Sequence, residues 1–200
     1  MSKLCKSLSG YTALTTESLI LDAGAFFLDF DIEEDTFESA VQAGKLLGAT
    51  RGGGQFSAIP EIRSIEVDGV KGKAKGLQVI DSWEVKMNAN VLEITKENLA
   101  RALTASEVDE VANETHDIIK AKNCIDLTDY IENITWLGTK SGSAEPLIIQ
   151  IFNALNTSGL TLQTQDQNEV VAAMEFEGHY DDVDLDNPPF AIYYPKPETP

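Results

Sequence analysis

Apolar and polar side chains alternate along residues 77–94, the stretch around which the rest of the chain is organised. Between the apolar positions lie mostly polar residues, among them Glu84, Lys86, Asn88 and Asn90. A period of two predicts a long β-strand with one buried face and one solvated face. The apolar positions are Trp83, Val85, Met87, Ala89 and Val91.

The period changes at Thr95. The Thr95 side chain can cap a helix by accepting a hydrogen bond from the next turn, and Leu99, Ala100 and Leu103 then fall on one stripe. This pattern predicts a short amphipathic helix over residues 95–103. A half-solvated strand that runs into such a helix suits a curved sheet that forms a wall, with the helix packed outside it.

Other segments also have strand-like patterns, and no βαβ rhythm connects them. A hairpin or bent strand pair is expected around Gly24, and Asp68-Gly69 predicts a hairpin turn. Helical spacing is present at residues 36–47 and 105–112. The remaining expected strands are 62–67, 117–121, 131–137, 147–155, 169–180 and 190–194. The predicted fold class is therefore mainly β: a β-sandwich or partial barrel with one flanking short α-helix and a long loop.

The domain organisation follows from these elements. We expect an N-terminal arm at residues 1–15, one β domain at 16–194 and a C-terminal tail at 195–200. The domain would contain a long loop at residues 44–76, because Gly52-Gly53-Gly54 costs backbone entropy in any regular element. This loop is expected to be mobile in a free subunit, so deletion of residues 50–58 should spare the fold.

The chain is strongly acidic, with 33 Asp and Glu against 15 Lys and Arg and a net charge of -18. Residues 101–200 carry -13 of this charge. A tight nucleic-acid binder needs clustered basic residues, so the composition argues against that class. It fits either simple solubility or a surface that must not hold DNA.

Other global features favour a reducing compartment and argue against a membrane-spanning segment. Cys5 and Cys124 have no CxxC spacing, which is typical of reduced thiols in a cytoplasm. The chain has no signal-peptide pattern and no apolar run of about 18 residues.

Motifs for catalysis, metals or cofactors are weak. The glycine run lacks the P-loop spacing. Asp182-x-Asp184-x-Asp186 starts like a calcium loop, but Asn187 and Tyr193 occupy positions that need Gly and Glu. The spacing around Asp29, Asp31 and Glu33 fails in the same way, and His116 and His179 form no metal spacing. We therefore expect no catalytic residue, no metal, no cofactor and no enzymatic activity.

Several segments resemble the major tail tube proteins of tailed bacteriophages and related prophages. They are residues 48–56 (Gly-Ala-Thr-Arg-Gly-Gly-Gly-Gln-Phe), 63–69, 75–77, 92–99 and 173–181 with the following Pro-Phe. The resemblance extends over roughly residues 15–195. It implies a β-sandwich subunit with a flanking helix, a hexameric ring whose inner wall is a continuous β-barrel, and stacked rings through which DNA passes. The tube of type VI secretion shares this architecture.

The resemblance also implies partners and site residues. The subunit would bind copies of itself, the tape measure protein, a tail-tip or baseplate initiator and a tail terminator, and DNA would pass without tight binding. The place of action would be the virion tail, after assembly in the bacterial host cytoplasm. Ring stacking is expected to use Arg51, Gly52, Gly53, Gly54 and Phe56. Lumen-facing positions are expected at Glu84, Lys86, Asn88, Asn90, Glu175 and Glu177, with Glu169 as a further candidate.

Two other functional classes remain open. A carbohydrate- or receptor-binding β module would be a monomer or trimer with solvent-facing aromatic side chains in a groove. The two tryptophans, Trp83 and Trp136, lie in alternating segments and are expected in the core. A small β-rich hydrolase would need clustered acids in a concave pocket, and no pair among the carboxylates is favoured.

Overall fold

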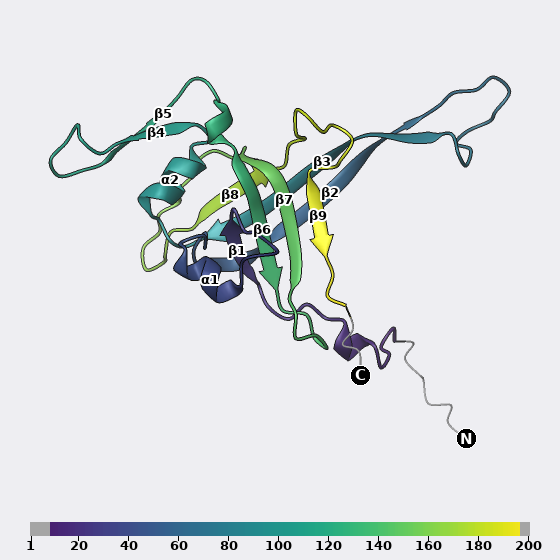
Figure 1. Cartoon of the computed structure of the whole chain (residues 1–200), viewed down its shortest axis with the longest axis horizontal. Helices are drawn as coiled ribbons and strands as arrows, with labels where there is room; N and C mark the ends of the chain where they lie inside the picture. Colours follow the sequence, from purple (N-terminus) through teal and green to yellow (C-terminus); the bar gives the residue numbers. More distant parts are fainter. Residues whose placement is uncertain (1–8, 197–200) are drawn as a thin grey trace.

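The computed structural model describes residues 9–196 and confirms a mainly β fold (Figure 1). Two short α-helices and two 3-10 turns accompany the strands. The helical elements are η1 (Thr15–Glu17), α1 (Phe37–Gln42), α2 (Lys96–Ala102) and η2 (Leu127–Asp129). The strands are β1 (Ala25–Leu28), β2 (Thr50–Ser64), β3 (Gln78–Val91), β4 (Ser106–Asp109), β5 (Ile118–Ala121), β6 (Ile131–Gly138), β7 (Leu147–Asn156), β8 (Ala172–Glu177) and β9 (Phe190–Tyr193).

One antiparallel sheet of seven strands forms the body, in the order β1-β6-β7-β8-β3-β2, with β9 paired to β7. Strand β7 belongs to both halves of this sheet. Its first part pairs with β6 and β9, whereas only Leu155 and Asn156 pair with β8. Asn153, two residues before the pairing with β8 begins, has a left-handed φ of 48°. The two halves of the sheet meet along β7, and both contribute side chains to the larger of two apolar cores.

Strand β3 supplies the centre of that core. Val85, Met87, Ala89 and Val91 are each at most 1% exposed, as the alternating pattern predicts. They pack in one cluster with side chains from the neighbouring strands. These are Phe26 of β1, Ile134 of β6, Ile151 of β7, and Met174 and Phe176 of β8. Trp83 and Trp136 pack against the edge of the same cluster and are partly buried.

Helix α2 begins as the sequence predicts. The Thr95 hydroxyl accepts a hydrogen bond from the Asn98 amide at 3.2 Å. The buried Asn98 side chain donates to the carbonyls of Leu47 at 2.9 Å and Glu93 at 3.0 Å, which ties the helix to the end of β3. Helix α1, capped by Thr36 and Ser39, is shorter than the predicted 36–47.

The expected long loop at residues 44–76 is wrong. Residues 50–64 are strand β2, which pairs along its length with β3, and only residues 65–77 form the hairpin turn. The glycines fit a strand here because the register shifts between Thr50 and Gly54, where Gly52 and Gly53 take positive φ. Deleting residues 50–58 would remove the first nine residues of this edge strand, so the structure predicts that the deletion disrupts the fold.

Two further local predictions are corrected. The helical spacing at 105–112 is misleading, because Ser106–Asp109 is strand β4 paired with β5 and Thr104 has a left-handed φ of 69°. The segment around Gly24 contains only one strand, β1. The expected arm and tail extend into residues 1–8 and 197–200, which lie outside the described part of the chain.

Two hairpins leave the body at opposite ends of the view in Figure 1. The β2–β3 arm, residues 61–82 with the turn at 65–77, continues the central sheet outward. The β4–β5 arm, residues 106–121, is a separate two-stranded sheet next to α2. Both arms expose much of their surface, so their side chains are accessible for contacts with other molecules.

Candidate assembly surfaces

The six positions expected to face a lumen lie together on one face of the sheet. Strand register places Lys86 opposite Glu177 and Asn88 opposite Glu175. On the other side of β3, Gln55 and Ser57 continue the same polar surface. The structure therefore groups these side chains, whereas their position in a lumen stays a prediction. We call this surface the polar face; it comprises Gln55, Ser57, Glu84, Lys86, Asn88, Asn90, Glu175 and Glu177.

Carboxylates outnumber ammonium groups on the polar face. Lys86 Nζ lies 2.7 Å from Glu84 and 3.6 Å from Glu175. The hydrogen bond to Glu84, together with the nearby carboxylates, raises the pKa of Lys86 above its usual value. Glu177 adds a third acid, so the face has a net negative charge.

Glu169, the further lumen candidate, lies in the loop before β8 and outside the strands. Its carboxylate pairs with Arg51 at 2.8 Å, and Arg51 also donates to Asn168 at 2.9 Å. Arg51 thus links the start of β2 to a loop from the last third of the chain. This ion pair is exposed to solvent on both sides.

The predicted ring-stacking glycines have a structural role in β2. A Cβ on Gly54 would lie 2.0 Å from the Asn88 carbonyl oxygen and 2.5 Å from the Phe26 ring. Phe56 turns inward and lies 5.9 Å from the Phe190 ring. Beside this strand is a groove of about 330 Å³. Its apolar lining includes Phe26, Phe56, Met87, Trp136 and Ile149.

The β2–β3 arm exposes aliphatic side chains that sequence inspection did not single out. Ile62 pairs with Ile80, and Ile59 lies three residues nearer the body, opposite Glu84. All three isoleucines are about half exposed. Ile80 falls among the polar positions of the alternation at 77–94, so the sequence could have indicated that its side chain lies on the solvated face of the strand. A cluster of this kind on an isolated ribbon is typical of a contact surface.

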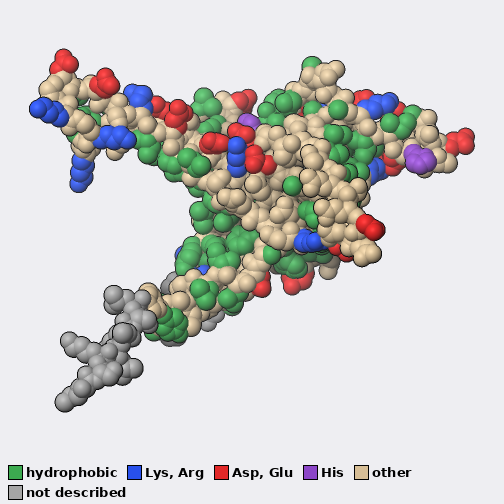
Figure 2. Space-filling view, turned by 180° about the vertical axis from the view of Figure 1, so that it is seen from behind, with side chains coloured by type: hydrophobic (Ala, Val, Ile, Leu, Met, Phe, Trp, Pro, Cys, Tyr) green, Lys and Arg blue, Asp and Glu red, His purple; other side chains and the backbone are tan. Residues whose placement is uncertain are grey.

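The turn of the β2–β3 arm is basic at its tip. Lys71, Lys73 and Lys75 lie there, and none of the three forms an ion pair within the part of the chain that the structure describes. Figure 2 shows several Lys and Arg side chains at the end of this arm, together with Asp and Glu side chains. Elsewhere most cations are already engaged by carboxylates.

The β4–β5 arm uses its charges internally. Lys96 of α2 contacts Glu110 and, at 3.0 Å, Asp117, and these two hydrogen bonds raise the pKa of Lys96. Asp109 accepts from the amides of Ala112 and Val111, and these bonds, with nearby Lys120, lower the pKa of Asp109. The Lys96 contacts join the arm to the helix, whereas those of Asp109 lie within the hairpin.

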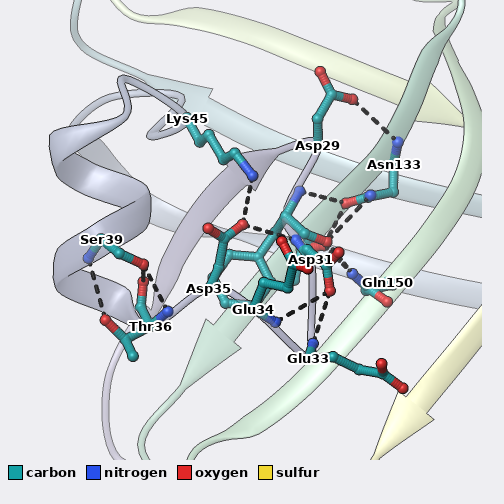
Figure 3. Close-up of polar contacts among 12 residues, drawn as sticks. Asp29, Asp31, Glu33, Glu34, Asp35, Thr36, Ser39, Lys45, Asn133 and Gln150 are labelled. Carbon is teal, nitrogen blue, oxygen red and sulfur yellow. Dashed lines mark hydrogen bonds and ion pairs between the residues drawn. The ribbon is translucent and has the colours of Figure 1, made fainter.

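The acidic motif at residues 29–35 organises its own turn (Figure 3). The Asp31 carboxylate accepts from the amides of Glu33 at 2.8 Å and Glu34 at 3.3 Å. Asp35 pairs with Lys45 and accepts from the Asp31 amide, and these bonds lower the pKa of Asp35. The calcium-like spacing therefore corresponds to a capped turn ahead of α1.

In residues 9–196, no three His, Cys, Asp or Glu side chains come together as a metal-ligand set. None of the helices in this range is both long enough and apolar enough to span a membrane. Comparison of the chain with protein-family models and with curated proteins gave no match.

Proposed function

We propose that this protein is a structural subunit of a tail tube of the bacteriophage or prophage type. In this proposal copies form hexameric rings, and the rings stack into a conduit for DNA. The observation that carries the proposal is the polar face. It is a continuous acid-rich surface of a long-stranded sheet, and within residues 9–196 one side of its edge strand β2 is unpaired.

The unpaired edge of β2 supports self-association. The strand has 15 residues and pairs only with β3 among the described residues. A long free edge exposes backbone donors and acceptors, and natural proteins usually block it or pair it. In a closed ring the edge would pair with the next copy. The polar face would then become part of a continuous inner wall.

The charge of the polar face supports passage of DNA. Phosphates are attracted by clustered cations through counterion release, and Lys86 is already engaged by Glu84 and Glu175. Excess carboxylates repel the phosphate backbone, so DNA would slide without being held. In the proposal the other partners are the tape measure protein, the initiator at the tip and the terminator. The place of action is the virion tail.

Assembly of the purified protein tests the proposal directly. At high concentration, or with a tail-tip initiator, negative-stain microscopy should show six-fold rings and tubes. Light scattering coupled to size exclusion gives the mass of any smaller species. Only monomers under every condition, including with the initiator, would overturn the proposal. A discrete monomer or trimer that binds glycans would instead favour the carbohydrate- or receptor-binding module.

A charge reversal tests the position of the polar face. Glu84→Lys places a second cation beside Lys86, and six-fold repetition in every ring would multiply it along the tube. Particles should still assemble, but DNA ejection should slow, most clearly at low salt where screening is weak. Glu33→Lys, an equally exposed change outside the polar face, is the matched control. Ejection by Glu84→Lys particles at the control rate would remove Glu84 from the channel wall.

A further inference from the structure

The tip of the β2–β3 arm combines unpaired cations with exposed aliphatic side chains. Lys71, Lys73 and Lys75 occur within five residues, and they outnumber the two acids of the same turn, Glu66 and Asp68. Val67 and Val70, in the same turn, are 47% and 43% exposed. A chain with a net charge of -18 offers few such groups, so the tip is chemically unlike the rest of the surface.

A complementary surface lies in the loop between β8 and β9. Asp181, Asp182, Asp184 and Asp186 form no ion pair in the described part of the chain. Their carboxylates are held only locally, for example by Val183 N–H on Asp181 and Asn187 on Asp184. Val183 and Leu185 stand between them, 87% and 69% exposed. The loop thus alternates acidic and aliphatic groups, whereas the tip carries a net positive charge next to exposed Val67 and Val70.

These two surfaces lie at opposite ends of the arm. Trp83 N–H donates to the Tyr180 hydroxyl at 2.9 Å, and the Trp83 ring packs on Phe190, so residues 180–190 flank the base of the arm. From Trp83 to Gln78, five residues of strand span roughly 16 Å before the turn begins. The ribbon in Figure 1 holds the tip away from the body. A tip therefore cannot reach the loop of its own copy.

From this arrangement we infer that the tip of one copy docks on the 181–187 loop of a second copy. If a second copy is shifted along the direction of the first copy's arm, its acidic loop lies next to the lysines of the first copy. The tip of the second copy is then free to bind the loop of a third copy. The contact is heterologous and repeats, so it builds a ring or a filament. This inference rests on the proposed function, because the tip-to-loop contact would be one of the contacts by which the copies assemble.

Charge reversal on each side tests the contact. One variant carries Lys71→Glu, Lys73→Glu and Lys75→Glu; the other carries Asp182→Lys, Asp184→Lys and Asp186→Lys. Alone, each should raise the concentration needed for assembly by at least about tenfold, because like charges then face each other. An equimolar mixture should recover assembly, since every tip then meets a loop of opposite sign. One chain with both sets should also recover it.

The control changes three exposed acids outside the loop: Glu33→Lys, Glu34→Lys and Glu114→Lys. It matches the charge change of the loop variant and should assemble as the wild type does. Lys→Gln at the three tip positions provides a milder variant, and unfolding midpoints confirm that each protein is folded. About 1 M salt should weaken wild-type assembly, because the screening length falls to about 3 Å.

Each outcome separates the contact from the proposed function. Rings or tubes from either reversed variant at the wild-type concentration would overturn the tip-to-loop contact and leave the proposed function standing. Loss of assembly without rescue in the mixture would also overturn it. Charge-dependent filaments that never close into rings would retain the contact and refute the tail-tube proposal. A wild type that stays monomeric under all conditions refutes both.

Discussion

The two hairpin arms of this molecule are anchored by different physical forces. The β2–β3 arm extends strands whose inner halves are buried, with Val85 and Met87 almost fully excluded from solvent. The β4–β5 arm has strands of four residues each and is attached through Lys96 and hydrogen bonds such as Ser106 Oγ to the Ala100 carbonyl. One arm is rooted in the core, and the other is held by surface charge.

This difference decides which charges remain for partners. Because burial holds the β2–β3 arm, the lysines at its tip need no partner within their own chain. At the β4–β5 arm, Lys96 of the adjacent helix α2 and Lys120 of the arm itself are already bound to carboxylates of the hairpin. An arm stabilised by apolar packing can therefore offer its charges to another molecule, whereas an arm stabilised by ion pairs has fewer to offer.

The same substitution at the root of the β2–β3 arm and within the β4–β5 arm should separate the two arms most strongly. Val85→Ala removes two methyl groups from a fully buried site and should lower the free energy of unfolding by about 2 to 3 kcal/mol. Val108→Ala, in β4 and 37% exposed, should change it little. Urea denaturation followed by circular dichroism measures both. Equal losses in the two variants would contradict a core-rooted β2–β3 arm.

The close approach at Gly54 gives the next largest effect. A methyl group there would overlap the Asn88 carbonyl and the Phe26 ring, so Gly54→Ala should destabilise the protein by about 1 to 3 kcal/mol. Gly10→Ala, with open space around it, is the control. A Gly54→Ala protein that unfolds at the control's denaturant midpoint would show that β2 can shift outward at this point.

Acid should loosen the β4–β5 arm selectively. The pKa of Asp109 is lowered in the folded state, so its contribution to the arm is present above the usual Asp pKa and is lost as pH falls through the lowered value. Below about pH 4, amide protection of residues 106–121 should decrease before that of β3. Asp109→Asn should remove most of this pH dependence. Simultaneous loss of protection in both arms would argue against separate anchoring.

The smallest expected effect comes from neutralising single lysines. Lys96→Gln should lower amide protection in residues 106–121, because Glu110 and Asp117 lose their shared cation. Lys71→Gln should change neither protection nor the unfolding midpoint, since Lys71 has no ion partner among the described residues. Hydrogen exchange followed by mass spectrometry resolves both segments. Lost protection in Lys71→Gln would reveal an internal role for the tip.

Local periodicity was sufficient to predict β3 and α2. Strand β3 alternates because one side is buried, and the cap at Thr95 depends only on residues within one turn. The grouping of Glu175 and Glu177 with Lys86 also followed from alternation in two strands, once these strands became neighbours. That they are neighbours could not be predicted from sequence, because strand order is set by contacts between distant residues.

The errors arose where distant residues decide the backbone. Three glycines suggest a loop by themselves, but in β2 they allow Phe26 and the Asn88 carbonyl to approach the chain. Val108 and Val111 have helical spacing, yet Val108 pairs with Ile119 from a segment ten residues further on. In both cases a non-local partner outweighed the local pattern.

The two tryptophans report on different parts of the molecule. Trp83 lies at the base of the β2–β3 arm, while the Trp136 indole N–H donates to the Ala23 carbonyl at 2.8 Å, beneath the segment that precedes β1. Each ring lies partly shielded from solvent, and the chain contains no other indole. In Trp83→Phe the remaining tryptophan is Trp136, so the fluorescence emission would report only on release of the segment before β1. In Trp136→Phe the emission would report only on events at the arm, so the protein carries its own pair of fluorescent probes.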